Sequence, residues 1–219
     1  MRSRFQQDLE LLKGKLLAMG GMAEHAVELA VRAYRDRNLA MCQEVLNGEH
    51  HINLAERQID ELAFDLLAMQ QPMAVDLRFI LAVIKINADL ERVGDQAVNI
   101  AQRVMEIATL PLVDLPADVP KMAAAATDMV RRALEAFISA NADEAQRILE
   151  MDDVVDQMNR DIFVAMEKAM CGSSNHTRQA LDIIIIARNL ERVADHATNI
   201  AEDVIFWTRG ADVRHHFQG

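Results

Sequence analysis

A twelve-residue segment of this 219-residue chain occurs twice, 100 residues apart. Residues 90–101 read LERVGDQAVNIA and residues 190–201 read LERVADHATNIA, so nine of the twelve positions are identical. Such self-similarity indicates that one structural unit is repeated in tandem. The proline-containing stretch 110–116 separates the two copies. We therefore expect a first repeat at residues 1–110 and a second at residues 111–219.

Both repeats are expected to consist of long helices. Apolar residues recur with the 3.6-residue period of an α-helix, for example at Leu90, Val93, Ala97, Ile100 and Val104. Only 8 Gly and 4 Pro interrupt the chain, and the low aromatic content of 4% favours packed helices over strands. The breakers delimit six helices, at 4–37, 40–70, 73–109, 118–140, 142–170 and 175–208. Because short loops join these rods, the predicted fold class is all-α, with two tandem three-helix bundles.

Charge and composition exclude several classes of protein. The formal net charge of −11 at pH 7 argues against a nucleic-acid binder, which presents clustered Lys and Arg to phosphates. Cys42 and Cys171 are isolated, so neither a disulfide framework nor a structural zinc site is expected. The start of the chain lacks a signal peptide, and the strongest apolar run, 183–187, is far shorter than the ~20 residues that span a bilayer. We therefore expect a cytoplasmic protein without membrane insertion.

Acidic residues recur at the same places in both copies of the segment. Glu91 and Asp95 correspond to Glu191 and Asp195, on the helix face opposite the apolar one. A solvated polar face is the simplest interpretation of such a stripe. Two observations favour a cation site instead. Both copies keep the acids, and Glu and Asp one turn apart repel each other unless a cation lies between them.

The second helix of each repeat carries a matching polar stripe. Its members follow one helix face at +4, +3, +4 spacing: Glu49, Asn53, Glu56 and Asp60 in the first repeat, and Asp152, Asp156, Asn159 and Phe163 in the second. Because Phe163 takes the fourth place, the two stripes are related but not identical.

The numbering predicts that the stripes of each repeat face one another. In an antiparallel hairpin, residues that lie level are equally far in sequence from the loop. Level pairs are centred on residue 72 in the first repeat and between residues 173 and 174 in the second: Glu49–Asp95 and Asn53–Glu91, then Asp152–Asp195 and Asp156–Glu191. Because neighbouring helix axes lie about 8–10 Å apart, side chains from both helices can reach one ion.

Oxygen ligands of this kind favour hard cations such as Mg²⁺, Ca²⁺ or Mn²⁺, and iron also accepts them. The predicted metal ligands are Glu49, Asn53, Glu91, Asp95, Asp152, Asp156, Glu191 and Asp195. His50 and His51 adjoin this set, but an exposed histidine pair is the simpler interpretation. The chain contains no Glu-x-x-His, which disfavours a ferritin-like di-iron oxidase.

No motif for catalysis is present. The sequence has no P-loop, GxGxxG, HExxH or GxSxG, and no nucleophile–base pair can be named. We therefore expect a cation-binding helical bundle with no catalytic residues. Two alternatives stay open: a metal-dependent phosphohydrolase that uses the acidic stripes, and a structural scaffold in which the stripes only solvate.

The sequence resembles the PhoU family from Phe5 to His215. Several short motifs carry the resemblance in order along the chain: Met19-Gly20, QPMAVDLR at 71–78, LERVGD and LERVAD, NIAEDVIF at 199–206, and GADVRH at 210–215. Each motif is weak alone, but all of them in this order are highly specific.

The resemblance implies two three-helix bundles whose E/D-x-x-x-D motifs bind metal clusters at the surface, with magnesium, manganese, iron or zinc as the cation. Three segments fit this motif directly: Glu91–Asp95, Asp152–Asp156 and Glu191–Asp195. Glu49–Asn53 departs from it, because Asn takes the last place. The resemblance also implies a homodimeric regulator that connects the ATPase of the phosphate ABC transporter to a sensor histidine kinase and represses the phosphate-starvation response.

Overall fold

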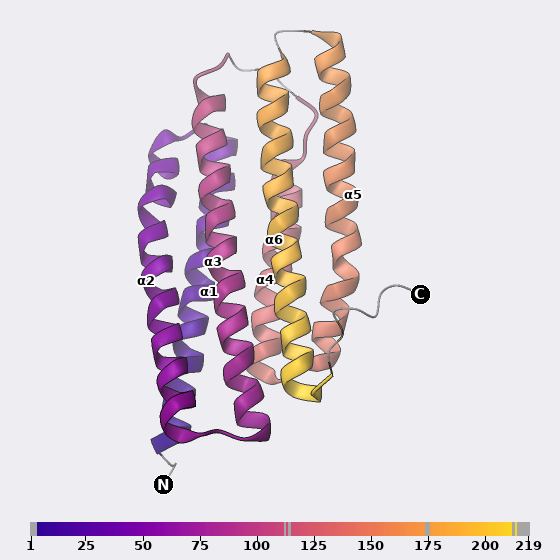
Figure 1. The fold of residues 1–219 in the computed structure, drawn as a ribbon. Helices are drawn as coiled ribbons and strands as arrows, with labels where there is room; N and C mark the ends of the chain where they lie inside the picture. The colour runs from indigo at the N-terminus through magenta and orange to yellow at the C-terminus, as the bar shows by residue number, and fades with distance from the viewer. Residues whose placement is uncertain (1–3, 112, 114, 174–175, 212, 214–219) are drawn as a thin grey trace.

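The computed structural model describes residues 4–111, 113, 115–173, 176–211 and 213. Within these ranges the chain forms six long helices and no strand (Figure 1), as predicted: α1 (Arg4–Asp36), α2 (Leu39–Gln70), α3 (Ala74–Ala108), α4 (Val119–Ser139), α5 (Ala142–Gly172) and α6 (Thr177–Arg209). The observed ends lie within two residues of the predicted ones, except that the predicted start of the last helix, residue 175, lies outside the described residues. Within the same ranges, no helix has both the length and the apolar character needed to cross a bilayer.

The same local chemistry turns the chain after the first helix of each repeat. Arg37 and Ala140 adopt the left-handed backbone conformation, with φ of 50° and 51°. Such a residue ends a helix and frees the chain to turn. The next residues, Asn38 and Asn141, accept hydrogen bonds from backbone N–H groups at the start of the following helix. Residues 103 positions apart therefore build equivalent α1–α2 and α4–α5 corners.

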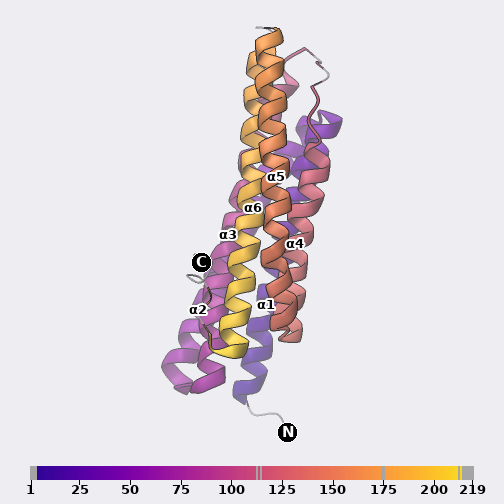
Figure 2. The same cartoon turned by 90° about the vertical axis from the view of Figure 1, so that its right-hand side faces the viewer.

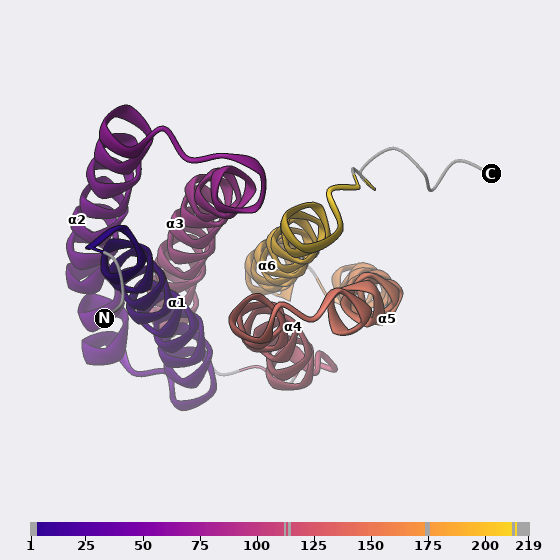
Figure 3. The same ribbon diagram turned by 90° about the horizontal axis from the view of Figure 1, so that it is seen from below.

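Helices α3 and α6 lie side by side at the centre of the molecule and join the two repeats (Figure 1). α2 borders α3 on one side and α5 borders α6 on the other, while α1 and α4 lie behind this row (Figure 3). All six helices run along one long axis, as Figure 2 shows from the side. The row α2, α3, α6 and α5 therefore forms one broad face, which we call the four-helix face.

Glycine permits close helix packing at two positions. A Cβ atom at Gly94 on α3 would lie 2.9 Å from Cδ1 of Ile52 on α2. A Cβ atom at Gly20 on α1 would overlap the side chain of Leu134 on α4. A larger residue at either position would displace the neighbouring side chain, so these glycines let α2 approach α3 within the first repeat and α1 approach α4 between the repeats.

An aromatic cluster also joins the repeats. Phe79 on α3, Phe137 on α4 and Trp207 on α6 contact one another, with ring centroids 5.2 to 5.5 Å apart. This spacing is typical of favourable aromatic pairs. The guanidinium of Arg78 donates a hydrogen bond to the backbone oxygen of Trp207 at 3.3 Å. The cluster therefore connects α3 of the first repeat to α4 and α6 of the second.

Charged pairs cross the contact between α3 and α6. The Lys85 ammonium lies 3.0 Å from Oδ1 of Asp203, and the Arg103 guanidinium lies 3.6 Å from Oδ1 of Asp182. Asp182 and Asp203 are each only 5% exposed. Because an unpaired charge is costly to bury, these partners stabilise the docked arrangement of the two repeats.

Candidate functional site

The predicted acidic stripes lie along the contacts between the second and third helix of each repeat. We use the name first acidic groove for the line of contact between α2 and α3, and second acidic groove for the line of contact between α5 and α6. The first acidic groove contains Glu49 and Asn53 from α2 with Glu91 and Asp95 from α3; the second contains Asp152 and Asp156 from α5 with Glu191 and Asp195 from α6. Each repeat thus has one such groove, between its second and third helices.

The glutamates of these grooves are less exposed than the helix periodicity suggests. The sequence places them opposite the apolar face, on the open outside of the bundle. In the structure, the side chain of Glu91 is 22% exposed and that of Glu191 is 17% exposed. The difference arises because the neighbouring helix covers part of each stripe. Carboxylates that lose contact with water repel one another more strongly. Their position between two helices therefore favours the protonated form.

The carboxylates of the second acidic groove act on one another. Burial, followed by the negative charges of Asp195 and Asp156, raises the pKa of Asp152 to about 6. Burial also raises the pKa of Glu191 and of Asp195, and the charge of Asp156 adds to both shifts. The influence of Asp195 on Asp152, and of Asp156 on Glu191, agrees with the register predicted from the numbering.

Arginines neutralise this groove only in part. The Arg188 guanidinium lies 3.2 Å from Oε2 of Glu191, and the Arg160 guanidinium lies 3.4 Å from Oδ2 of Asp156. The two arginine side chains are 61% and 58% exposed. Ion pairs with such exposed partners contribute little, about 0–1 kcal/mol each. The second acidic groove therefore retains excess negative charge.

The first acidic groove has a weaker version of the same electrostatics. Burial raises the pKa of Glu91, and the charges of Asp95, Glu56 and Glu49 add to the shift. The Arg92 guanidinium opposes it from 3.7 Å away. Asn53 contributes an amide instead of a carboxylate, so this groove carries one acid fewer at the predicted ligand positions.

Asn87 occupies the end of the first acidic groove and was not singled out in the sequence. Its side chain is 1% exposed and donates hydrogen bonds to Oδ1 of Asp60 at 2.9 Å and to the backbone oxygen of Glu56 at 3.0 Å. The corresponding residues of the second repeat are Phe163 and Ala187, which cannot form this contact. The signal in the sequence is an asparagine within the apolar pattern of the third helix.

A histidine contact between the repeats was also missed. Nδ1 of His196 lies 2.9 Å from Oδ1 of Asp89, and the Asn199 amide donates a hydrogen bond to the same oxygen at 3.1 Å. The two copies of the repeated segment differ here, because Gln96 stands in place of His196. That difference marks the place where α6 meets α3 of the other repeat.

The donor atoms of the two acidic grooves suit a hard cation. Oδ1 of Asn53 and Oδ1 of Asp152 are buried and have no hydrogen-bond partner within the described ranges. Buried oxygens normally have a partner, and both belong to the predicted ligand set. Within the described part of the chain, no three His, Cys, Asp or Glu side chains converge closely enough to hold an ion as they stand. The oxygen atoms at these positions are of the type that hard cations take as ligands.

Taken with the repeat, this geometry defines a class: all-α proteins with two tandem three-helix bundles, each with an acidic groove between its second and third helices. The family model of the PhoU domain matches this chain twice, at residues 16–104 and 119–204. The chain belongs to the PhoU family.

Relatives with established names cover nearly the whole chain. The phosphate-specific transport system accessory protein PhoU homolog of Pseudomonas aeruginosa is 37% identical over 215 residues, which cover 97% of this chain and 88% of the relative. The homolog of the same name from Rhizobium meliloti is 35% identical over 210 residues, which cover 95% and 89%. These relatives are named as accessory proteins of phosphate transport.

Solved structures confirm the architecture. The crystal structure of PhoU from Pseudomonas aeruginosa matches with a TM-score of 0.90 and 36% identity, over 95% of this chain and 100% of that chain. The phosphate transport system regulatory protein PhoU from Streptococcus pneumoniae matches with a TM-score of 0.89 and 26% identity, over 96% and 99%. Two tandem three-helix repeats are therefore the shared fold.

Proposed function

We propose that this protein is a negative regulator of the phosphate-starvation response that also modulates phosphate uptake. The observation that carries the proposal is family membership along both repeats, with relatives named as phosphate-specific transport system accessory proteins. The protein acts by binding other proteins and not by catalysis.

The proposed partners are the ATPase of the phosphate ABC transporter and its sensor histidine kinase. A cytoplasmic homodimer serves as the adaptor between them. Two docked repeats suit this role, because a rigid body with two related halves can contact two proteins at once. The charge pairs and aromatic cluster between α3 and α6 support such rigidity.

Divalent or iron cations are proposed to occupy the acidic grooves. The support comes from the buried, unpartnered oxygens of Asn53 and Asp152 and from the raised pKa of Asp152. A bound cation would supply positive charge where neighbouring carboxylates repel one another. Metal analysis of protein purified without chelator tests this, and a metal-free protein that gains no stability from added Mn²⁺ or Mg²⁺ would contradict it.

A metal-dependent phosphohydrolase is the second candidate. It is favoured by the pKa of Asp152 near 6, which suits a carboxylic acid for proton transfer close to neutral pH. The open position of the acidic grooves between surface helices disfavours it, because hydrolysis requires a site that controls water. Turnover of p-nitrophenyl phosphate with Mn²⁺ that is lost in Asp152→Asn would establish this activity.

Deletion of the gene tests the regulatory role. We expect phosphate-starvation genes to switch on in the deletion strain while phosphate is plentiful, and the intact gene to restore repression. A transcriptional reporter of one such gene gives the readout. Reporter activity that is unchanged by the deletion would refute the proposed role in regulation.

A further inference from the structure

An apolar groove on the first repeat is separate from the acidic grooves. It lies between α1 and α2 and has a volume of about 210 Å³. We call it the Gly48 groove; its lining includes Met22, Leu29, Val45, Gly48 and Ile52. Sites for drug-sized ligands usually measure about 300–1,000 Å³. The Gly48 groove is therefore of a size for an inserted side chain and too small for a large cofactor.

Gly48 creates the space in this groove. Within a helix, glycine costs roughly 0.5–1 kcal/mol relative to alanine. Gly20 and Gly94 offset that cost by allowing close packing, but a Cβ atom at Gly48 would have no neighbour within 4 Å. Gly14 and Gly21 also have open space around them, on the exposed surface. Gly48 is half-buried, so its missing side chain leaves a hollow between two helices.

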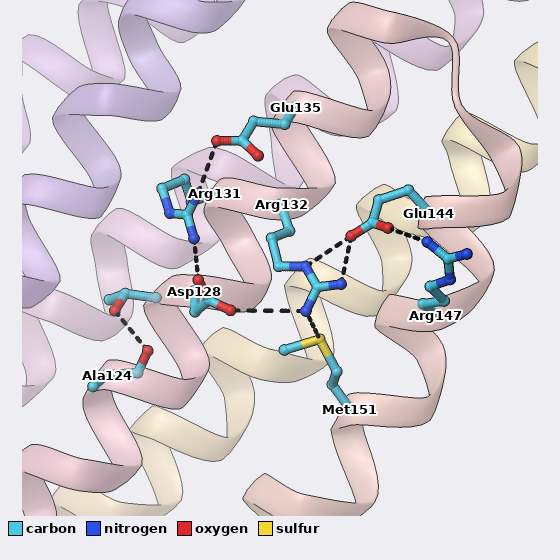
Figure 4. Close-up of polar contacts among 9 residues, drawn as sticks. Ala124, Asp128, Arg131, Arg132, Glu135, Glu144, Arg147 and Met151 are labelled. Atoms are coloured by element: carbon cyan, nitrogen blue, oxygen red, sulfur yellow. Dashed lines mark hydrogen bonds and ion pairs between the residues drawn. The ribbon is translucent and has the colours of Figure 1, made fainter.

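The second repeat fills the same position with its own side chains. Residues 103 positions further along the chain replace Leu29 with Arg132 and Gly48 with Met151. The Arg132 guanidinium lies 3.0 Å from the Met151 sulfur, and its Nε donates a hydrogen bond to Glu144 at 2.8 Å (Figure 4). The two repeats thus share one helix arrangement, but only the first leaves the space for a methionine-sized group open.

Charge at the edge of the groove is also reversed between the repeats. Glu44 lines the Gly48 groove, and Arg147 stands at the equivalent position of the second repeat. Among the described residues that line the groove, Glu44 alone carries a fixed charge, beside the exposed His25 and His51. An apolar floor with an acidic edge disfavours phosphate and other anions. It complements an apolar side chain that has a basic neighbour.

We infer that the Gly48 groove is a docking site for a helix of a partner protein. The helix inserts one methionine or leucine side chain over Gly48 and places a lysine or arginine, one turn away, against Glu44. Amphipathic helices commonly bind in this way, with apolar anchors in a groove between two helices. Met151 shows within the same molecule which type of side chain fits the space.

A peptide titration tests the docking site without reference to phosphate regulation. The probe is a helical 16-residue peptide with one central methionine and a lysine four residues later, added to the full ¹⁵N-labelled chain. We expect saturable shifts of the amide signals of Val45, Gly48 and Ile52. A matched peptide with glutamine in place of methionine should bind at least tenfold more weakly. No shift with the methionine peptide would overturn the inference.

Variants of the chain separate docking from nonspecific binding. Gly48→Met should weaken binding of the methionine peptide at least tenfold, because it fills the groove as Met151 fills its counterpart. Gly48→Ala, which adds one methyl group, should retain most of the affinity. Gly14→Met, on the exposed surface of α1, controls for an added methionine elsewhere. Equal affinity of Gly48→Met and the parent protein would overturn the inference.

Two further measurements identify what occupies the groove. Glu44→Lys should lower the affinity for the methionine peptide, because its lysine then meets a positive charge. A peptide with glutamate in place of that lysine should bind the Glu44→Lys variant more tightly. Sedimentation of the parent and Gly48→Met proteins tests a second copy of this chain as the occupant. Loss of self-association in Gly48→Met would overturn docking of a different protein. Gly48→Ala should melt at or above the parent temperature, since no atom lies within 4 Å of a Cβ at Gly48, and thermal melts of the other variants check that each one is folded.

Discussion

The two repeats are alike in the repeated segment of their third helices and differ in the grooves between their first two helices. The third helices share nine of twelve residues in the repeated segment and contact each other across the centre of the molecule. The grooves between the first two helices differ in size and charge, with Gly48 and Glu44 in one repeat and Met151 and Arg147 in the other. The first two helices of the repeats therefore present different surfaces, although the repeated segments of the third helices are nearly the same.

At one contact between the second and third helices, the two repeats differ in the position of a single carbon. In the first repeat, Ile52 packs against Gly94, where a Cβ atom would lie 2.9 Å from Cδ1 of Ile52. The equivalent residues of the second repeat are Val155 and Ala194, in the same register. One carbon has in effect moved from the second helix to the third, so the combined volume of each pair is nearly the same. Cores tolerate exchanges that conserve volume in this way.

The largest expected effect concerns metal in the two acidic grooves. If Glu191 and Asp195 share a cation with the acids of α5, Glu191→Ala combined with Asp195→Ala should remove the stabilisation that the ion provides. A ligand at a hundredfold excess over its dissociation constant contributes about 2.7 kcal/mol. Thermal melts with and without Mn²⁺ measure the loss.

The equivalent double variant of the first repeat tests whether the two acidic grooves bind metal independently. Glu91→Ala with Asp95→Ala should remove the contribution of the first acidic groove, which is weaker because Asn53 supplies an amide. Without metal, either double change should be neutral or mildly stabilising, since it relieves repulsion between acids one turn apart. Identical responses to Mn²⁺ in parent and variants would show that the acids only solvate the surface.

The next effect concerns the contact between Gly94 and Ile52. Gly94→Ala should destabilise the protein by about 1–3 kcal/mol, because the added Cβ overlaps Ile52. Adding Ile52→Val should recover most of that loss, since it recreates the Val–Ala pair of the second repeat. Chemical denaturation of the two single variants and the double variant measures the coupling. Additive losses would mean that the two residues do not compensate each other.

A smaller effect is expected for Asp152 in metal-free protein. Its pKa is about 6 in the folded chain, compared with 3.8 for the reference carboxyl, so the folded state holds the proton more tightly. Stability contributed by this residue is therefore lost as pH rises from about 4 to above 6. Asp152→Asn should be more stable than the parent at pH 8 by about 1–2 kcal/mol, a figure discounted for partial exposure. The difference should vanish near pH 4, and a difference independent of pH would contradict this explanation.

The smallest effect concerns the glycine of the Gly48 groove. Gly48→Ala should stabilise the protein by about 0.5–1 kcal/mol, because alanine is the better helix former and its methyl group meets open space. Met151→Ala at the equivalent position should instead destabilise it, since Met151 contacts Arg132. Thermal melts compare the two changes. Destabilisation by Gly48→Ala would show that the glycine is needed for packing.

The helices could be predicted from sequence because their limits depend on local chemistry. Asn38 and Asn141 begin helices through their side chains, and Gln71-Pro72 interrupts the chain before α3. The order of six helices and the register of the level acids follow from these limits. The contact between α3 and α6 could not be predicted in this way. Helical periodicity identifies the apolar face of a helix, but it does not show which other helix packs against a second face.

The site was only partly predictable for the same reason. Spacing alone placed Asp152 near Asp195, and the charge of Asp195 raises the pKa of Asp152, which agrees with that placement. The solvent exposure of Glu91 and Glu191 depends on how closely the neighbouring helix packs against them, and no local sequence pattern predicts that distance. His196 and Asp89 lie more than 100 residues apart and meet only because the repeats dock. Contacts between repeats therefore require the three-dimensional structure.

The aromatic cluster makes intrinsic tryptophan fluorescence a report on the contact between the two repeats. Trp207 is the only tryptophan in the chain, and it lies against Phe79 of the first repeat and Phe137 of the second. Its emission therefore depends on whether the two halves stay docked. Any ion, peptide or partner that loosens the halves should shift that emission toward longer wavelength as water reaches the indole. A change that leaves the aromatic cluster intact should leave the emission wavelength unaltered.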